Sequence, residues 1–196
     1  RVIRLGVCAA VCAIVLTGRP LRLRNVIWLR HRGRRANINP QAGWEFFIPA
    51  EEAKAGERIS EMKPRVDRQG PAVLDWYLKK IRPLIDPEKK SIYLFPAIRT
   101  ASGRLNPSTF RQWFQSAAND ANMPMTFHRF RHGFASILVR MGKPMRNIAD
   151  MLANTEAVCS KRYAFLDPDR SAKKAQDAMA RAAFEAERTI RKKVVK

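Results

Sequence analysis

The order of two kinds of apolar spacing along the chain is the strongest constraint on its fold. Apolar residues recur at helical spacing up to about residue 31 and again from residue 74 onward. Between these parts, residues 33–63 contain turn residues and short pieces in which apolar and polar residues alternate. This order predicts a mainly helical α+β fold with one small three-stranded antiparallel sheet.

The expected elements follow from these spacings. Helices are expected over residues 1–16, 21–31, 74–85, 107–121, 127–141, 144–153, 155–164 and 169–192. Strands are expected over residues 36–39, 44–49 and 58–62, with a hairpin turn at 55–57. We expect one domain over residues 1–165, followed by a helical tail over residues 166–196.

The charge is strongly positive and unevenly placed. The chain has 38 Lys and Arg against 17 Asp and Glu, a formal net charge of +21, and no acidic residue precedes Glu45. A domain with this imbalance repels itself unless a polyanion offsets the charge, and nucleic acid is the commonest polyanion. We therefore predict a nucleic-acid partner, although ribosomal, chromatin or anionic-membrane binding would also fit the charge alone.

The amino-terminal apolar run and the cysteines bear on location. The run Leu5 to Leu16 follows Arg1 and Arg4 as in a signal peptide, but it is too short to span a bilayer and precedes no small-residue cleavage site. We interpret it as a buried helix and expect no membrane partner. The three cysteines (Cys8, Cys12 and Cys159) are an odd number without metal-ligand spacing, which favours a reducing, intracellular compartment and no metal.

The segment 126–135 has the most specific pattern. His128 and Arg131 lie three residues apart on a predicted helix, so they share one side of it, while phenylalanines mark the core side. This arrangement joins a group that can transfer a proton to one that can clamp a phosphate. On these residues alone, a solvated surface pair remains the alternative.

With the downstream sequence, this segment resembles the carboxyl half of tyrosine recombinases, the phage integrase family. The family pattern H-x-x-R-H-x-x-A is followed by L-G-H and then by R-Y, and residues 128–135, 152–154 and 162–163 match it in order and spacing. Packing explains the other two tyrosines, Tyr77 and Tyr93. The resemblance therefore implies that Tyr163 is the nucleophile.

Residues 17–26 resemble the first motif of the family, T-G-x-R-x-x-E. Arg22 fits best as the first clamp arginine, with Asn25 in place of the usual acidic residue. Arg19 and Arg24 are close competitors for this role.

The catalytic lysine of the family lies at or near a hairpin of the small sheet. Lys54, before the turn at 55–57, has that place, and Lys63 is the alternative. Asn154 departs from the family, which has His or Trp there. Asn can donate a hydrogen bond but cannot be cationic, so reduced turnover or a relative that only binds DNA is an open alternative.

The resemblance implies the catalytic domain (residues 1–165) of a site-specific DNA recombinase or integrase, which cuts and rejoins strands through a 3′-phosphotyrosyl intermediate without metal, ATP or other cofactor. Arg22 and Arg131 would clamp the scissile phosphate, His128 would accept the phenol proton, and Lys54 would protonate the leaving oxygen. Asn154 would be a neutral donor. His132 and Asn25 would support the site. The expected DNA-backbone contacts are Arg19, Arg24, Arg129 and Arg162.

The resemblance also implies partners and a location. We expect double-stranded DNA, self-association into a synaptic tetramer through the tail, and a cytoplasmic, nucleoid-associated protein encoded by a bacterium or phage. The amino-terminal DNA-clamping domain of the family is expected to be absent from this chain. The alternatives are a DNA-binding relative with impaired catalysis, a type IB topoisomerase-like nicking and resealing enzyme, and an unrelated basic RNA- or ribosome-binding protein.

Overall fold

The computed structural model describes residues 1–49, 65–98 and 103–163, with isolated positions between 166 and 184. The elements are α1 (Val2–Thr17), α2 (Leu23–Ile27), β1 (Ile38–Asn39), β2 (Glu45–Phe46), α3 (Gly70–Trp76), the π-helical turn η3 (Tyr77–Ile81), α4 (Arg82–Ile85), α5 (Pro107–Asp120), α6 (Phe127–Arg140), α7 (Met145–Leu152) and α8 (Glu156–Tyr163). The predicted class, mainly helical with a small antiparallel sheet, is confirmed. The predicted tail helix lies largely outside the described residues.

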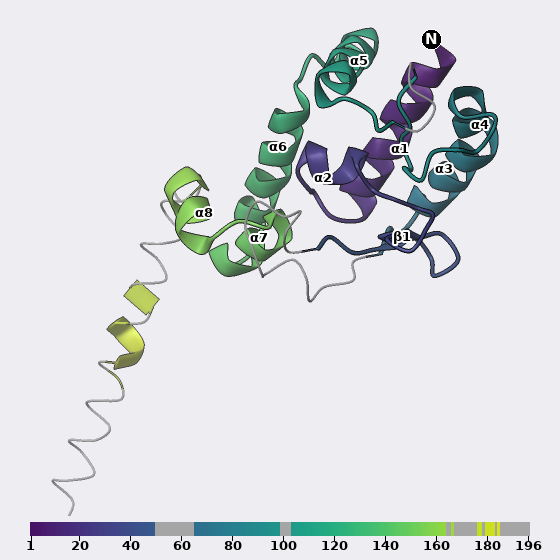
Figure 1. The fold of residues 1–196 in the computed structure, drawn as a ribbon. Helices are drawn as coiled ribbons and strands as arrows, with labels where there is room; N and C mark the ends of the chain where they lie inside the picture. Colours follow the sequence, from purple (N-terminus) through teal and green to yellow (C-terminus); the bar gives the residue numbers. More distant parts are fainter. Residues whose placement is uncertain are drawn as a thin grey trace, which may run out of the picture.

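Helix α1 forms the centre of the main core. One side of the helix is buried, with Val11 and Ile14 fully enclosed, and it packs against α3, η3 and α5 (Figure 1). Gly6 permits the close approach of η3, because a Cβ there would lie 2.6 Å from Cγ1 of Ile81. The prediction of a buried amino-terminal helix is confirmed. None of the helices in the described ranges is long and apolar enough to cross a membrane.

The small sheet differs from the expected one. Within the described residues it has two antiparallel strands, β1 and β2, in which Ile38 pairs with Phe46. An isolated bridge joins Glu45 to Arg65. The predicted third strand, residues 58–62, lies outside the described residues.

Helix α2 is much shorter than the predicted helix 21–31. It ends at Ile27 because the following residues pair with a distant extended segment. Leu94 N donates to Leu29 O at 2.7 Å, and Arg30 forms an antiparallel bridge with Tyr93. The extended segment thus forms hydrogen bonds with backbone groups that a longer helix would have used for its own.

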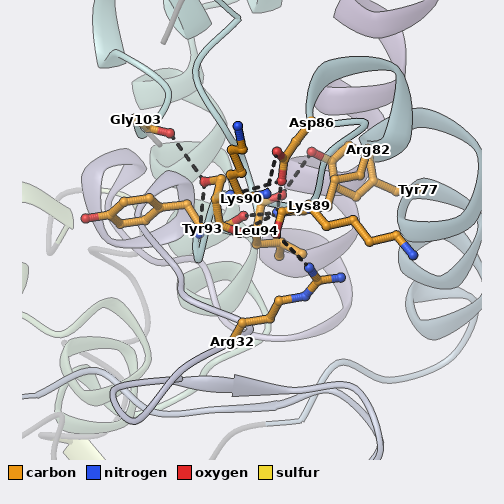
Figure 2. Close-up of polar contacts among 10 residues, drawn as sticks. Arg32, Tyr77, Arg82, Asp86, Lys89, Lys90, Tyr93, Leu94 and Gly103 are labelled. Carbon is orange, nitrogen blue, oxygen red and sulfur yellow. Dashed lines mark hydrogen bonds and ion pairs between the residues drawn. The ribbon is translucent and has the colours of Figure 1, made fainter. Parts of the chain in front are cut away.

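A buried polar network holds this extended segment (Figure 2). Arg82 and Asp86 form an ion pair at 3.0 Å in which both side chains are 3% exposed. Arg82 also donates to the carbonyl oxygens of Ser91 (2.8 Å) and Tyr93 (3.1 Å). The Ser91 hydroxyl in turn donates to Gly103 O at 3.4 Å. This network therefore holds the chain on both sides of residues 99–102, through Tyr93 before them and Gly103 after them.

A second, smaller core lies among α7, α8 and the far half of α6, which runs from α5 toward α7 (Figure 1). Two buried arginines join this core to the loop after α1. Arg131 donates to Pro20 O at 2.5 Å and to Leu152 O. Arg19 donates to Met151 O at 3.0 Å and to Asp150 O. The candidate site lies at this junction.

Candidate active site

A cavity of about 620 Å³ opens where the two cores meet. Side chains from α2, α5, α6, α8 and the turn between α7 and α8 line it, and within the described residues none of them is acidic. The lining includes five arginines: Arg22, Arg24, Arg111, Arg131 and Arg162. Positive charge concentrated in a concave site attracts anions, and phosphate groups match the fork of an arginine.

Local backbone geometry places the lining residues. Thr126 caps α6 by accepting a hydrogen bond from Arg129 N at 3.3 Å, so α6 starts at Phe127 and carries His128 and Arg131 in its first turns. At the other side, Ala153 ends α7 in the left-handed conformation, with φ 47°. This turn directs Asn154 into the cavity lining.

The two predicted clamp arginines are held in place. Arg22 donates through Nη2 to Oδ1 of Asn154 at 3.0 Å. Arg131 is 7% exposed and is fixed by its two carbonyl acceptors. Burial, followed by the charge of Arg22, lowers the pKa of Arg131 to about 10, which still leaves it cationic at neutral pH. Both guanidiniums are thus oriented before any anion binds.

A chain of three hydrogen-bonding side chains leads out from the tyrosine. The Tyr163 hydroxyl lies 2.5 Å from Nδ1 of His132, and Nε2 of His132 lies 2.8 Å from Nε2 of His128. Arg162 Nη1 lies 3.4 Å from the same Nε2 of His132. If Nδ1 of His132 accepts the phenol proton, its Nε2–H can donate to His128.

Burial and nearby charge set the protonation states in this chain. Burial raises the pKa of Tyr163. Burial also lowers the pKa of both histidines, and the nearby Arg162 and Arg131 lower them further. At neutral pH the tyrosine is therefore protonated and the histidines are neutral. This is the combination in which a histidine can take a proton from a phenol.

The structure brings together most of the residues predicted for the site. The same cavity is lined by five of them: Arg22, His128, Arg131, Asn154 and Tyr163. Lys54, like its alternative Lys63, lies outside the described residues.

Two predicted roles change with the geometry. His132, predicted only to support the site, makes the direct contact with Tyr163, whereas His128, predicted as the direct proton acceptor, lies one hydrogen bond further away. Arg19, predicted to contact the DNA backbone, is 2% exposed. Its guanidinium is directed at main-chain carbonyls of α7, so the prediction of a surface contact is wrong.

The remaining predicted residues lie at different distances from the cavity. Arg24 and Arg162 line it, whereas Arg129 is exposed outside it. Asn25 is not among the lining residues, and its backbone N donates to Arg22 O at 2.9 Å. Arg111 was not predicted, because no motif surrounds it. Its place next to the core residue Phe110 on α5 was its only signal.

Among the described residues, no three His, Cys, Asp or Glu side chains are grouped so as to hold a metal ion. The model of the phage integrase family matches residues 51–170. The fold is similar to the crystal structure of XerA recombinase, with 20% sequence identity and a TM-score of 0.58. The match covers 80% of this chain but only 54% of that one, about half its length. No curated protein matches the sequence.

Proposed function

The chain belongs to the phage integrase family, and on that premise we propose that it is a site-specific DNA recombinase or integrase that acts through a 3′-phosphotyrosyl intermediate. The observation that carries this proposal is the contact of 2.5 Å between the Tyr163 hydroxyl and His132 in an arginine-lined cavity. The proposed partner is double-stranded DNA.

The arginines suit a phosphodiester. Arg22 and Arg131 come from distant parts of the chain and line one cavity, so together they can bind the non-bridging oxygens of a single phosphate. Attack on that phosphate increases the negative charge on these oxygens. Oriented guanidiniums at a partly buried site stabilise this charge more than water does.

In the proposed cleavage step, the Tyr163 oxygen forms a bond to phosphorus while the bond from phosphorus to the 5′-oxygen breaks. The phenol proton passes to Nδ1 of His132, and the proton on Nε2 of His132 passes to the exposed His128. Because His128 is exposed, it can pass this proton on to solvent. We assign protonation of the 5′-oxygen to Lys54, as the family resemblance implies. The covalent link conserves the bond energy, so rejoining needs no ATP.

Asn154 supports an active enzyme more than an inactive relative. Its Oδ1 holds Arg22, and its side chain also hydrogen-bonds with Cys159. We propose that Asn154 positions Arg22 and that the second N–H of its amide donates to a phosphate oxygen. Arg111 and Arg162 provide further positive charge in the same cavity. We propose that these cations compensate for the His or Trp that the family has at this position.

The test is covalent capture on DNA. We would incubate the protein with a pool of nicked duplexes of randomised sequence, recover complexes that survive detergent, and sequence the attached strands. The wild type is expected to form a covalent adduct with a 3′ end, and Tyr163→Phe to form none while still binding DNA. Tyr93→Phe is the matched control and is expected to keep the adduct. DNA binding without any adduct in the wild type would support the binding-only relative instead, and relaxation of supercoiled DNA by lone chains would support the topoisomerase-like alternative.

The chain's subdivision enters the same proposal. We propose that residues 1–165 form the catalytic unit and that the tail, residues 166–196, mediates association of subunits on DNA. Analytical ultracentrifugation of a chain ending at residue 165, with and without target DNA, would test this role.

A further inference from the structure

Two arginines stack on one tryptophan at the edge of the candidate active site. The guanidinium carbon of Arg24 lies 4.0 Å from the centre of the Trp28 ring, and that of Arg104 lies 3.5 Å from it. Both arginines are exposed, and within the described residues neither pairs with an acidic side chain. Two like charges are therefore held at one ring, and no carboxylate from the described ranges pairs with either of them.

Arg24 and Trp28 belong to the same short helix. They lie four residues apart, so both side chains are on one side of α2 and its last turn. Arg24 also lines the cavity that contains Tyr163. The residue after Trp28 is fixed by the hydrogen bond from Leu94 N to Leu29 O. The ring thus has a defined place next to the cavity.

Arg104 reaches this ring from a different part of the chain. It forms an antiparallel bridge with Pro96. The preceding residue, Gly103, accepts hydrogen bonds from Ala97 N at 3.0 Å and from the Ser91 hydroxyl at 3.4 Å, the second of which is drawn in Figure 2. The buried network around Ser91 therefore supports the backbone that carries Arg104.

Stacking determines what these guanidiniums can bind. A guanidinium that lies over an aromatic ring interacts through its face, and its N–H groups in the plane remain free to donate. Those N–H groups fit two oxygens of one phosphate. Restricting the side chain in advance also reduces the entropy lost on binding. The ligand that suits two such groups beside a phosphodiester cavity is a further phosphate of the same strand.

We propose that Arg24 and Arg104, aligned by Trp28, form a second phosphate-binding site that holds the DNA backbone next to the cleavage position. This inference rests on the proposed function, because it takes DNA as the ligand. It assigns to Trp28 a positioning role and to Arg104 a direct contact with the backbone.

The experiment measures equilibrium binding of full-length protein to a fluorescent 30-base-pair duplex over a range of salt concentrations. Each lost phosphate contact should reduce the slope of log affinity against log salt by about 0.9. Arg104→Ala is therefore expected to lower this slope by about one and the affinity roughly tenfold at low salt. The matched control is Arg140→Ala, which removes an exposed guanidinium at the end of α6, outside the cavity lining.

Two substitutions of Trp28 test whether its ring aligns the two arginines, because neither substitution changes their charge. Trp28→Phe keeps an aromatic face and should bind DNA nearly as well as the wild type. Trp28→Leu keeps both arginines but removes the face, and should weaken binding several-fold. Thermal unfolding of each variant checks that the fold is kept. The inference is overturned if Arg104→Ala has the same affinity and slope as Arg140→Ala, a comparison that does not depend on Trp28 variants folding.

The same samples, mixed with the nicked duplex pool, report separately on the proposed function. A wild type that forms the covalent adduct while Arg104→Ala binds like the control would reject only the second phosphate site. A wild type that forms no adduct, but whose DNA binding depends on Arg104, would reject the phosphotyrosyl mechanism and retain this site.

Discussion

Replacing His132 tests the proton path most directly. Its Nδ1 lies 2.5 Å from the Tyr163 hydroxyl, and within the described residues no other histidine contacts this hydroxyl. His132→Ala would leave a phenol whose pKa is raised by burial without an adjacent base. We expect the rate of covalent adduct formation to fall strongly, while DNA binding at saturating protein is retained.

The size of the effect follows from the protonation of the phenol. A tyrosine with an ordinary pKa of about 10 is ionised in roughly one molecule in 10³ at pH 7. The pKa of Tyr163 is raised above this value, so fewer molecules still are ionised. Because positioned bases contribute about 10²- to 10⁴-fold, His132→Ala should slow cleavage at pH 7 by about 10²- to 10³-fold. This loss corresponds to roughly 3–4 kcal/mol in activation free energy.

The assay is the single-turnover rate of adduct formation between pH 5.5 and 9.5. In the wild type, the pKa of His132 is lowered, so the base stays unprotonated and the rate should be level from below pH 6.5 upward. In His132→Ala the rate should rise about tenfold per pH unit, because the ionised phenol itself must attack. His128→Ala, which removes only the second acceptor, should lose less. A level profile in His132→Ala, or a greater loss in His128→Ala, would refute the assignment of His132 as the direct base.

Two further predictions concern stability and are measured by chemical denaturation. Asp86→Ala leaves Arg82 charged and buried, and should lower the free energy of unfolding by about 3–5 kcal/mol. The control Glu88→Ala breaks an exposed ion pair with Lys90 and should lower it by about 1 kcal/mol or less. Equal losses in the two variants would contradict the importance of burial. Ala153→Gly should raise stability by roughly 1 kcal/mol, because Ala153 has φ 47° and glycine adopts this conformation without a Cβ clash. No gain in Ala153→Gly would show that the turn before Asn154 is not strained.

Local apolar spacing predicted the helices that bury one face, but it could not predict which residues of that face are buried. Helices α5 and α6 begin at Pro107 and Phe127, the residues at which the sequence predicted them to begin. In the second half of α6, however, the large residue Ile137 is 59% exposed and the small Ala135 is fully buried. The reason is that α7 and α8 pack against α6, and small residues allow this approach. The early end of α2 is likewise set by the pairing of Leu29 with Leu94. Because this pairing joins distant parts of the chain, the local sequence does not indicate it.

Spacing predicted the candidate site as a set of neighbours, whereas the individual contacts depend on tertiary geometry. The three-residue interval between His128 and Arg131 places them on one side of a helix in any fold. Which histidine meets Tyr163 depends instead on where α8 lies along α6, and this placed His132 closer. Arg19 and Arg22 stand only three residues apart in the same motif. Arg19 donates to main-chain carbonyls at the end of α7, whereas Arg22 lines the cavity.

Arg131 connects the chemistry of the site to its assembly. Its guanidinium lines the cavity, yet it also donates to Pro20 O in the loop after α1 and to Leu152 O at the end of α7. The first carbonyl belongs to the loop that carries Arg22, and the second lies two residues before Asn154. Because Arg22 and Asn154 are themselves hydrogen-bonded, Arg131 closes a ring of contacts across the two cores. The side chains that would clamp a phosphate are thus positioned by the same contacts that dock α6, α7 and α8 on the rest of the domain, so the clamp is complete only when that docking is.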